Sequence, residues 1–403
     1  MDHTQLITQL YRSEFAKMVA VTGRLLGLQH IDVAEDIVSD TFLIAAEKWS
    51  DNSVPPNPEA WLYTVARNKT QDFLRRHNVF TGKIAPALKT ENTAITDEDP
   101  FTDHAIRDSQ LRMLFAVCHP AIAVEAQIAL ALRILCGLTV DEIAVAFFTN
   151  KETITKRLYR AKAKLNETGL SLEMPSDRTL PERMEGVLHI IYLLFNEGYR
   201  SSAGDSVLRK DLCLEALRLG ILLTKYPATD LPATNALIAL MCFHASRFDA
   251  RDDTALYDDQ DETLWDSELI KLGTYYLHLS AKGDKITRYH LEAAIARWHC
   301  TREDSHEKWD GILQLYNQLL QINYSPRIAL NRTYAYYKVY GNDAALAEAL
   351  KLKMESDHFY HALLGELYKT VNKARSKEHF QQALALARSE ADRKIILIKL
   401  QNL

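Results

Sequence analysis

The stretch Gly137–Leu165, "GLTVDEIAVAFFTNKETITKRLYRAKAKL", contains two short helical patterns on either side of a tight turn. Thr139, followed three positions later by Glu142, is typical of a capping box, in which a hydroxyl and a carboxylate satisfy the free N–H groups at a helix start. Phe148–Asn150 is long enough only for a tight turn, and Asn150 is a favourable N-cap residue. The stretch therefore predicts a helix-turn-helix.

The second helix of this pair combines an apolar stripe with positive charge. Ile154, Leu158, Ala161 and Leu165 recur at helical spacing and predict a buried face, and the basic residues lie outside it. In a helix-turn-helix the second helix enters the major groove of DNA. We therefore expect base and phosphate contacts from Lys151, Thr153, Thr155, Lys156, Arg157, Arg160, Lys162 and Lys164. The alternative is an amphipathic helix whose lysines only keep its outer face solvated.

The composition indicates that any DNA binding is local. The chain has 403 residues, 47% of them hydrophobic, and a formal net charge of −5, which excludes a uniformly basic nucleic-acid coat. The N-terminus lacks a signal-peptide pattern, and no apolar run reaches the ~18 residues of a membrane span. The five cysteines are far apart and form no C-x-x-C pair, which predicts buried, reduced thiols. We expect a cytoplasmic protein without a membrane partner.

Helical periodicity runs along the whole chain and predicts an all-α fold. We expect a small helical domain at 1–77, a linker at 78–104 with the acidic run Asp97–Asp99, a second small helical domain at 105–170, and a helical C-terminal block at 171–403. In that block, the segments starting at Leu330 and Leu364 each predict a helix, a polar turn and a second helix. Their offset is near the tetratricopeptide period, which favours a helical-repeat domain over an irregular helical domain.

The sequence contains no motif for catalysis or cofactor binding. No nucleophile elbow, phosphate-binding loop, dinucleotide fingerprint or spaced set of histidine ligands is present. The acidic stretch "DQDETLWD" (Asp259–Asp266) is more typical of helix-capping and loop residues beside Trp265 than of a metal site. We therefore expect no enzyme activity, no catalytic residues, no metal and no cofactor.

Two amphipathic stretches precede the helix-turn-helix, "DVAEDIVSDTFLIAAEKW" (Asp32–Trp49) and "EAWLYTVARNKTQDFLRRH" (Glu59–His77). In the first, we place the acidic side chains of Glu35, Asp36 and Asp40 on one side of a helix. In the second, we expect an apolar core that includes Trp61 and Val65.

Taken together in this order, the three stretches resemble the extracytoplasmic-function (group IV) sigma factors, the small alternative promoter-recognition subunits of bacterial RNA polymerase. The C-terminal stretches "LPERMEGVLHIIYLLFNEGY" (Leu180–Tyr199), "DQDETLWD" and "SPRIALNRTYA" (Ser325–Ala335) resemble the subgroup that carries a tetratricopeptide-like extension. Phe148 stands in the turn where many relatives have glycine, so we expect a different turn geometry.

The resemblance implies that the chain initiates transcription at promoter DNA together with core RNA polymerase. Contacts to the β′ clamp coiled coil are implied for Glu35, Asp36, Asp40, Thr41 and Phe42, with the β flap as a further polymerase contact. Contacts to the promoter element nearest the start site are implied for Trp61, Asn68, Lys69, Asp72, Arg75 and Arg76. The helix-turn-helix is implied to read the distal element, and the C-terminal domain to regulate activity and bind a protein partner.

Two other classes of protein remain as alternatives. A conventional helix-turn-helix regulator with a ligand- or protein-sensing helical domain would bind an operator without polymerase. A tetratricopeptide scaffold would bind peptides, and its basic helix would have no task.

Overall fold

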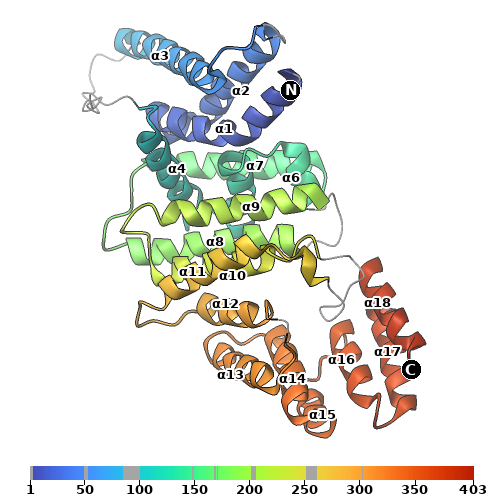
Figure 1. The fold of residues 1–403 in the computed structure, drawn as a ribbon. Helices are drawn as coiled ribbons and strands as arrows, with labels where there is room; N and C mark the ends of the chain where they lie inside the picture. The colour runs from blue at the N-terminus through green and yellow to red at the C-terminus, as the bar shows by residue number, and fades with distance from the viewer. Residues whose placement is uncertain are drawn as a thin grey trace. The chain divides into compact units, whose positions relative to one another are not determined.

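The computed structural model describes residues 3–49, 53–84, 100–147, 149–167, 169, 171–200, 206–250, 261–301 and 303–403. These residues are mostly helical and contain no strand, which confirms the predicted all-α fold (Figure 1). They form two compact units, residues 1–197 and 198–403. The boundary lies inside helix α8 (Leu180–Arg200), so the first unit includes more of the chain than the two expected small domains.

The first block of the first unit contains α1 (His3–Leu26), the short η1 (Leu28–His30), α2 (Ile31–Lys48) and α3 (Pro58–Ile84). α1 packs against both α2 and α3. Helix α3 continues beyond the expected domain end at residue 77. Within residues 58–77 of this helix, the buried residues are Leu62, Ala66 and Thr70, whereas Trp61 and Val65 are only half-buried. The expected core residues Trp61 and Val65 thus lie beside the buried stripe, which follows steps of four from Leu62.

The second block contains the predicted helix-turn-helix. Its elements are α4 (Asp103–Val117), α5 (Val124–Leu130), the π-helical turn η2 (Ala131–Leu135), α6 (Val140–Ala146) and α7 (Lys151–Glu167). The capping box is present: Glu142 N–H donates to Thr139 Oγ1 at 3.2 Å, and Thr139 N–H donates to Glu142 Oε2 at 2.8 Å. Asn150 caps α7 by accepting from Thr153 N–H at 2.8 Å. Phe148 and the acidic run 97–99 lie outside the described residues.

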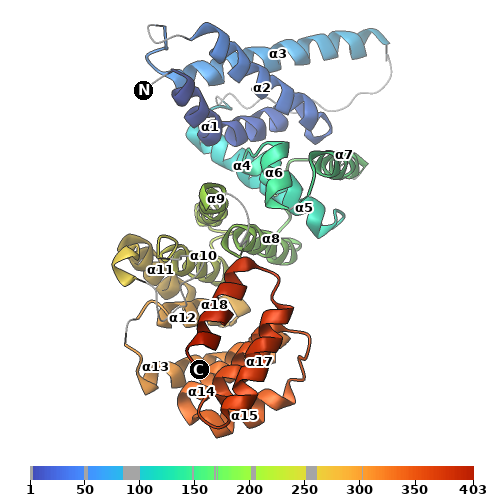
Figure 2. The same ribbon diagram turned by 90° about the vertical axis from the view of Figure 1, so that its right-hand side faces the viewer.

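The two blocks pack together through α1. This helix contacts α4 and η2, and it lies beside α4 in both views (Figures 1 and 2). Gly23 permits the close approach, because an added Cβ would lie 3.0 Å from Met113 Cε and 3.1 Å from Ile31 Cδ1. Arg24 also reaches across to Asp108 with an N–O distance of 2.7 Å.

The second unit is a succession of packed helices: α9 (Ser206–Leu223), α10 (Pro232–Ala245), η4 (Glu262–Leu264), α11 (Ser267–Ser280), α12 (Arg288–Trp298), α13 (His306–Ile322), α14 (Pro326–Tyr340), α15 (Asn342–Lys351), α16 (His358–Tyr368), α17 (Lys373–Leu386) and α18 (Glu390–Gln401). The two expected helix pairs are α14 with α15 and α16 with α17. Gly365 lets α17 approach α16, since an added Cβ would lie 2.9 Å from the Phe380 ring.

The acidic stretch before α11 caps helices. Asp261 accepts from Thr263 N–H at 2.9 Å, and Asp266 accepts from Glu268 N–H at 2.9 Å and Leu269 N–H at 3.0 Å. Both side chains therefore act as the sequence predicts, while Asp259 lies outside the described residues.

None of the five cysteines forms a disulfide bond, in agreement with the predicted reduced thiols. Four are buried and Cys300 is half-buried. Burial raises the pKa of the Cys118 and Cys242 thiols to about 12, so both remain protonated and unreactive near neutral pH. In the part of the chain that the structure describes, no helix is both long and apolar enough to cross a membrane.

Candidate nucleic-acid interface

Helix α7 has a basic outer face, because its apolar residues lie on one side and its basic residues on the other. The four residues of the predicted stripe are buried, as expected. Arg157 is half-buried, with its guanidinium carbon 5.1 Å from the centre of the Phe147 ring. The exposed residues of the predicted DNA-contacting set are Lys151, Thr153, Thr155, Lys156, Arg160 and Lys164.

Several of these lysines form ion pairs with acidic neighbours. Lys151 lies 2.8 Å from Asp141, and Lys156 lies 2.7 Å from Glu152. Both partners of each pair are largely exposed, and such pairs contribute only about 0–1 kcal/mol to stability. Little stability would therefore be lost if a phosphate group replaced these carboxylates as the partner of Lys151 or Lys156.

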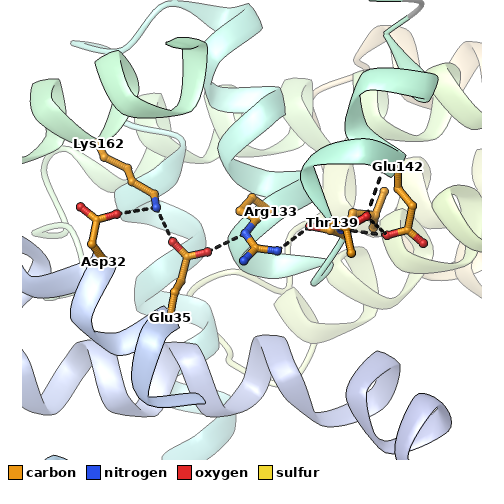
Figure 3. A network of polar contacts seen from close by, with 7 residues as sticks. Asp32, Glu35, Arg133, Thr139, Glu142 and Lys162 are labelled. Atoms are coloured by element: carbon orange, nitrogen blue, oxygen red, sulfur yellow. Dashed lines mark hydrogen bonds and ion pairs between the residues drawn. The ribbon is translucent and has the colours of Figure 1, made fainter. Parts of the chain in front are cut away.

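Lys162 has different surroundings from the other basic residues of α7 (Figure 3). Its Nζ lies 2.6 Å from Asp32 Oδ1 and forms a closer contact with Glu35 Oε2. Its side chain is only 15% exposed. Burial alone lowers the pKa of Lys162, but the carboxylates of Glu35 and Asp32 outweigh this effect and raise it. Lys162 therefore faces α2 and remains charged.

Arg133 completes this group of charges from η2. Its Nε donates to Glu35 Oε1 at 2.6 Å and its Nη1 donates to the Leu138 carbonyl at 3.0 Å. We call Asp32, Glu35, Arg133 and Lys162 the α2–α7 ion network. Arg133 was not predicted from the sequence, because it lies in a strongly apolar stretch and its partner Glu35 is 98 residues away in the chain.

The expected polymerase-contacting residues of α2 divide into two groups. Asp36 and Asp40 are exposed, whereas Glu35, Thr41 and Phe42 are buried. Thr41 donates its hydroxyl to the Ile37 carbonyl at 2.8 Å. The expectation that the three acids share one side was wrong for Glu35, which turns towards the second block.

Leu43 was also missed by the sequence analysis. It is 61% exposed beside the acidic positions of α2. An exposed leucine on an amphipathic helix becomes recognisable only when the buried face of that helix is known.

The expected proximal-element residues lie along α3, where three of the six are exposed and three are half-buried. Asn68, Arg75 and Arg76 are exposed, while Trp61 is half-buried and packs edge-on against Trp49 at 5.3 Å between ring centres. Two of the charged residues form ion pairs: Lys69 Nζ lies 3.1 Å from Asp40 Oδ2, and Arg75 donates to Asp72 at 2.9 Å. Asp72 thus has a cationic partner on its own helix.

Tyr159 is a further residue that the sequence analysis passed over. It is 75% exposed on α7, one turn after Thr155. Its position outside the apolar stripe of α7 could have indicated from the sequence that it is exposed. No group of three or more potential metal-ligating side chains occurs among the described residues.

Comparisons with known proteins match two stretches of the chain to protein families. Residues 10–79 match the sigma-70 region 2 family, and residues 183–281 match a family of unknown function, DUF6596. The RNA polymerase sigma factor NccH of Alcaligenes xylosoxydans xylosoxydans is 27% identical over 150 residues, which cover 37% of this chain and 79% of that protein. These findings support a sigma factor of the sigma-70 family.

A second relative covers nearly the whole chain. The uncharacterized protein R00370 of Rhizobium meliloti (strain 1021) is 34% identical over 397 residues, which span 96% of this chain and 94% of the relative. The chain belongs to the same family as this protein. No solved structure matches significantly.

Proposed function

We propose that the chain is an alternative sigma factor of the extracytoplasmic-function (group IV) type with a regulatory helical-repeat extension. The observation that carries the proposal is the combination, within one compact unit, of a sigma-70 region 2 and a helix-turn-helix with a basic outer face. The chain would direct core RNA polymerase to promoters by binding, while the polymerase performs the chemistry, so it is not itself an enzyme.

The exposed side of α2 is the proposed docking surface for the β′ clamp coiled coil. Asp36 and Asp40 lie one helical turn apart and are both exposed, with Leu43 next to them. This surface combines charge for orientation with an apolar contact for affinity. The β flap is the proposed second polymerase contact, through the helix-turn-helix block.

Promoter recognition would divide between α3 and α7. Asn68, Arg75 and Arg76 provide amide and guanidinium groups for open bases and their phosphates near the start site. The exposed residues of α7 would read the distal element as duplex, where phosphate contacts position the helix and a few side chains specify bases.

We call the first compact unit, residues 1–197, the sigma unit. The C-terminal extension would regulate the sigma unit by binding a protein partner. The pairs α14/α15 and α16/α17 support a tetratricopeptide-like stack. A cavity of about 200 Å³ opens within this unit, and its lining includes the apolar or aromatic side chains of Leu330, Tyr334 and Phe359 and the basic side chains of Arg327 and Lys399. This mixed lining suits a short peptide segment.

The test is transcription by the full-length chain with bacterial core RNA polymerase on a library of genomic promoter fragments. We expect specific transcripts that require the chain. The Asp36→Lys/Asp40→Lys variant should lose core polymerase binding at least ten-fold. The Glu173→Lys/Asp177→Lys variant makes the same charge change at exposed loop positions away from α2 and should bind normally.

A different result would favour the regulator class. If the chain neither binds nor redirects core polymerase but binds promoter duplex alone, the sigma proposal is wrong and the helix-turn-helix serves an operator-binding protein.

A further inference from the structure

The α2–α7 ion network joins two elements to which the proposed function gives different partners. Glu35 lies on the proposed polymerase-docking helix, and Lys162 lies on the proposed promoter-reading helix. We propose that this network is an autoinhibitory latch that holds the sigma unit closed in the free chain, and that core polymerase binds only after it opens. This inference rests on the proposed sigma function.

The charges of the network compensate one another. Glu35 uses one oxygen for Arg133 and the other for Lys162, and its side chain is only 6% exposed. Asp32 supplies the second carboxylate to Lys162. A buried charge that loses its partner is strongly disfavoured, because it regains neither water nor an opposite charge. Glu35, Arg133 and Lys162 therefore separate together rather than one pair at a time, whereas the exposed Asp32 adds a solvated partner to Lys162.

Apolar packing extends the latch beyond these four side chains. Arg133 lies over the Phe15 ring of α1, with its guanidinium carbon 5.2 Å from the ring centre. Gly137 also lies against Phe15, since an added Cβ would be 3.4 Å from its Cδ1. Gly137 has φ +71°, so glycine suits both the backbone and the contact. The closed state thus rests on a continuous interface, unlike an isolated surface ion pair.

The closed arrangement conflicts with both proposed binding events. Glu35 is covered by Arg133 and Lys162, and Asp32 lies one turn before the exposed Asp36 on the same helix. A polymerase surface that covers Asp36 therefore meets the α7 side chain held at Asp32. The same ion pairs hold α7 at α2, and α7 also packs against η1. The block that contains α3 and the block that contains α7 therefore cannot separate while the latch is closed.

The experiment locks the latch in the full-length chain. The Asp32→Cys/Lys162→Cys variant is cross-linked with a reducible bis-maleimide, and its affinity for core polymerase is measured without DNA, before and after reduction. We expect the linked form to bind at least ten-fold more weakly than the reduced form. Equal affinities of the two forms would overturn the latch.

Two controls separate this outcome from the failure of the sigma proposal. The Lys210→Cys/Asp249→Cys variant places the same linker across an exposed ion pair of the second unit, with an N–O distance of 3.0 Å, and its affinity should not depend on reduction. The affinity of the wild-type chain after treatment with the linker shows whether reaction of the native cysteines affects polymerase binding. If the untreated wild-type chain does not bind core polymerase, the sigma proposal itself fails.

A second variant tests the latch without a linker. Lys162→Ala leaves Glu35 paired with Arg133 but removes the contact between α7 and α2. We expect tighter polymerase binding by several-fold, together with faster amide hydrogen exchange in α2 and α7 of the free chain. Unchanged affinity and exchange in a folded variant would contradict the proposal.

Discussion

Glu35 and Asp36 are adjacent carboxylates on α2 with opposite environments. Glu35 is buried between Arg133 and Lys162, whereas Asp36 is exposed to solvent. At the scale of single residues, the buried Glu35 therefore supports the fold, whereas the exposed Asp36 remains available to a partner.

The Glu35→Ala substitution should destabilise the first unit by about 3 kcal/mol, because it leaves two largely buried cations without their shared carboxylate. Asp36→Ala should change the free energy of unfolding by less than about 0.5 kcal/mol. Chemical denaturation followed by circular dichroism measures both. Similar values for the two variants would show that the buried carboxylate contributes no more than a surface charge.

Because of His299, we expect the stability of the second unit to depend on pH. Burial, with Arg247 and Lys308 nearby, lowers the pKa of His299 to about 3 from its ordinary 6.5. The folded state therefore resists a proton that the unfolded chain accepts below pH ~6.5. The resulting stability is present above pH 6.5 and is lost as the pH falls towards 3.

Unfolding measured between pH 7 and 4 tests this prediction. The His299→Phe variant should show a shallower decline than the wild type, by up to about 1.4 kcal/mol per pH unit for the single proton. The matched replacement His306→Phe alters an exposed imidazole, and the prediction is wrong if it flattens the profile equally.

At the scale of elements, the helix-turn-helix depends on its caps. α6 is short, so the capping box contributes a large part of its local stability. Thr139→Ala should cost about 1 kcal/mol, whereas Thr139→Ser keeps the accepting hydroxyl and should cost less.

The expected local effect is faster hydrogen exchange of the α6 amides in Thr139→Ala. Affinity of the polymerase complex for the distal promoter element should also fall, because α6 supports the orientation of α7. An alanine variant with exchange rates equal to those of the serine variant would rule out this role of the cap.

At the scale of the whole molecule, α8 belongs in large part with the sigma unit. Arg183 at its start donates to the Phe115 carbonyl of α4, and Arg112 of α4 donates to the Leu172 carbonyl. Met184, Val187 and Ile191 are buried on α8. A boundary at residue 170 would remove these contacts from the first unit.

A fragment of residues 1–197 should therefore unfold cooperatively and at a higher temperature than a fragment of residues 1–175. Differential scanning calorimetry of the two fragments measures the difference. If both fragments melt at the same temperature, α8 does not stabilise the sigma unit.

Much of the fold and part of the candidate site were readable from the sequence. The capping box at Thr139, the cap at Asn150 and the stripe from Ile154 to Leu165 were predicted and are present. These features depend on residues within one or two helical turns, so local spacing is sufficient to identify them. The same holds for the helix pairs of the second unit.

The sequence by itself determined the helices, their caps and the basic character of α7. Only the tertiary structure decided that Glu35 is buried and that Lys162 faces α2. Glu35 is separated in the chain from Arg133 by 98 residues and from Lys162 by 127. No local pattern marks such partners, because the pairing depends on how α1 and α2 pack against the second block.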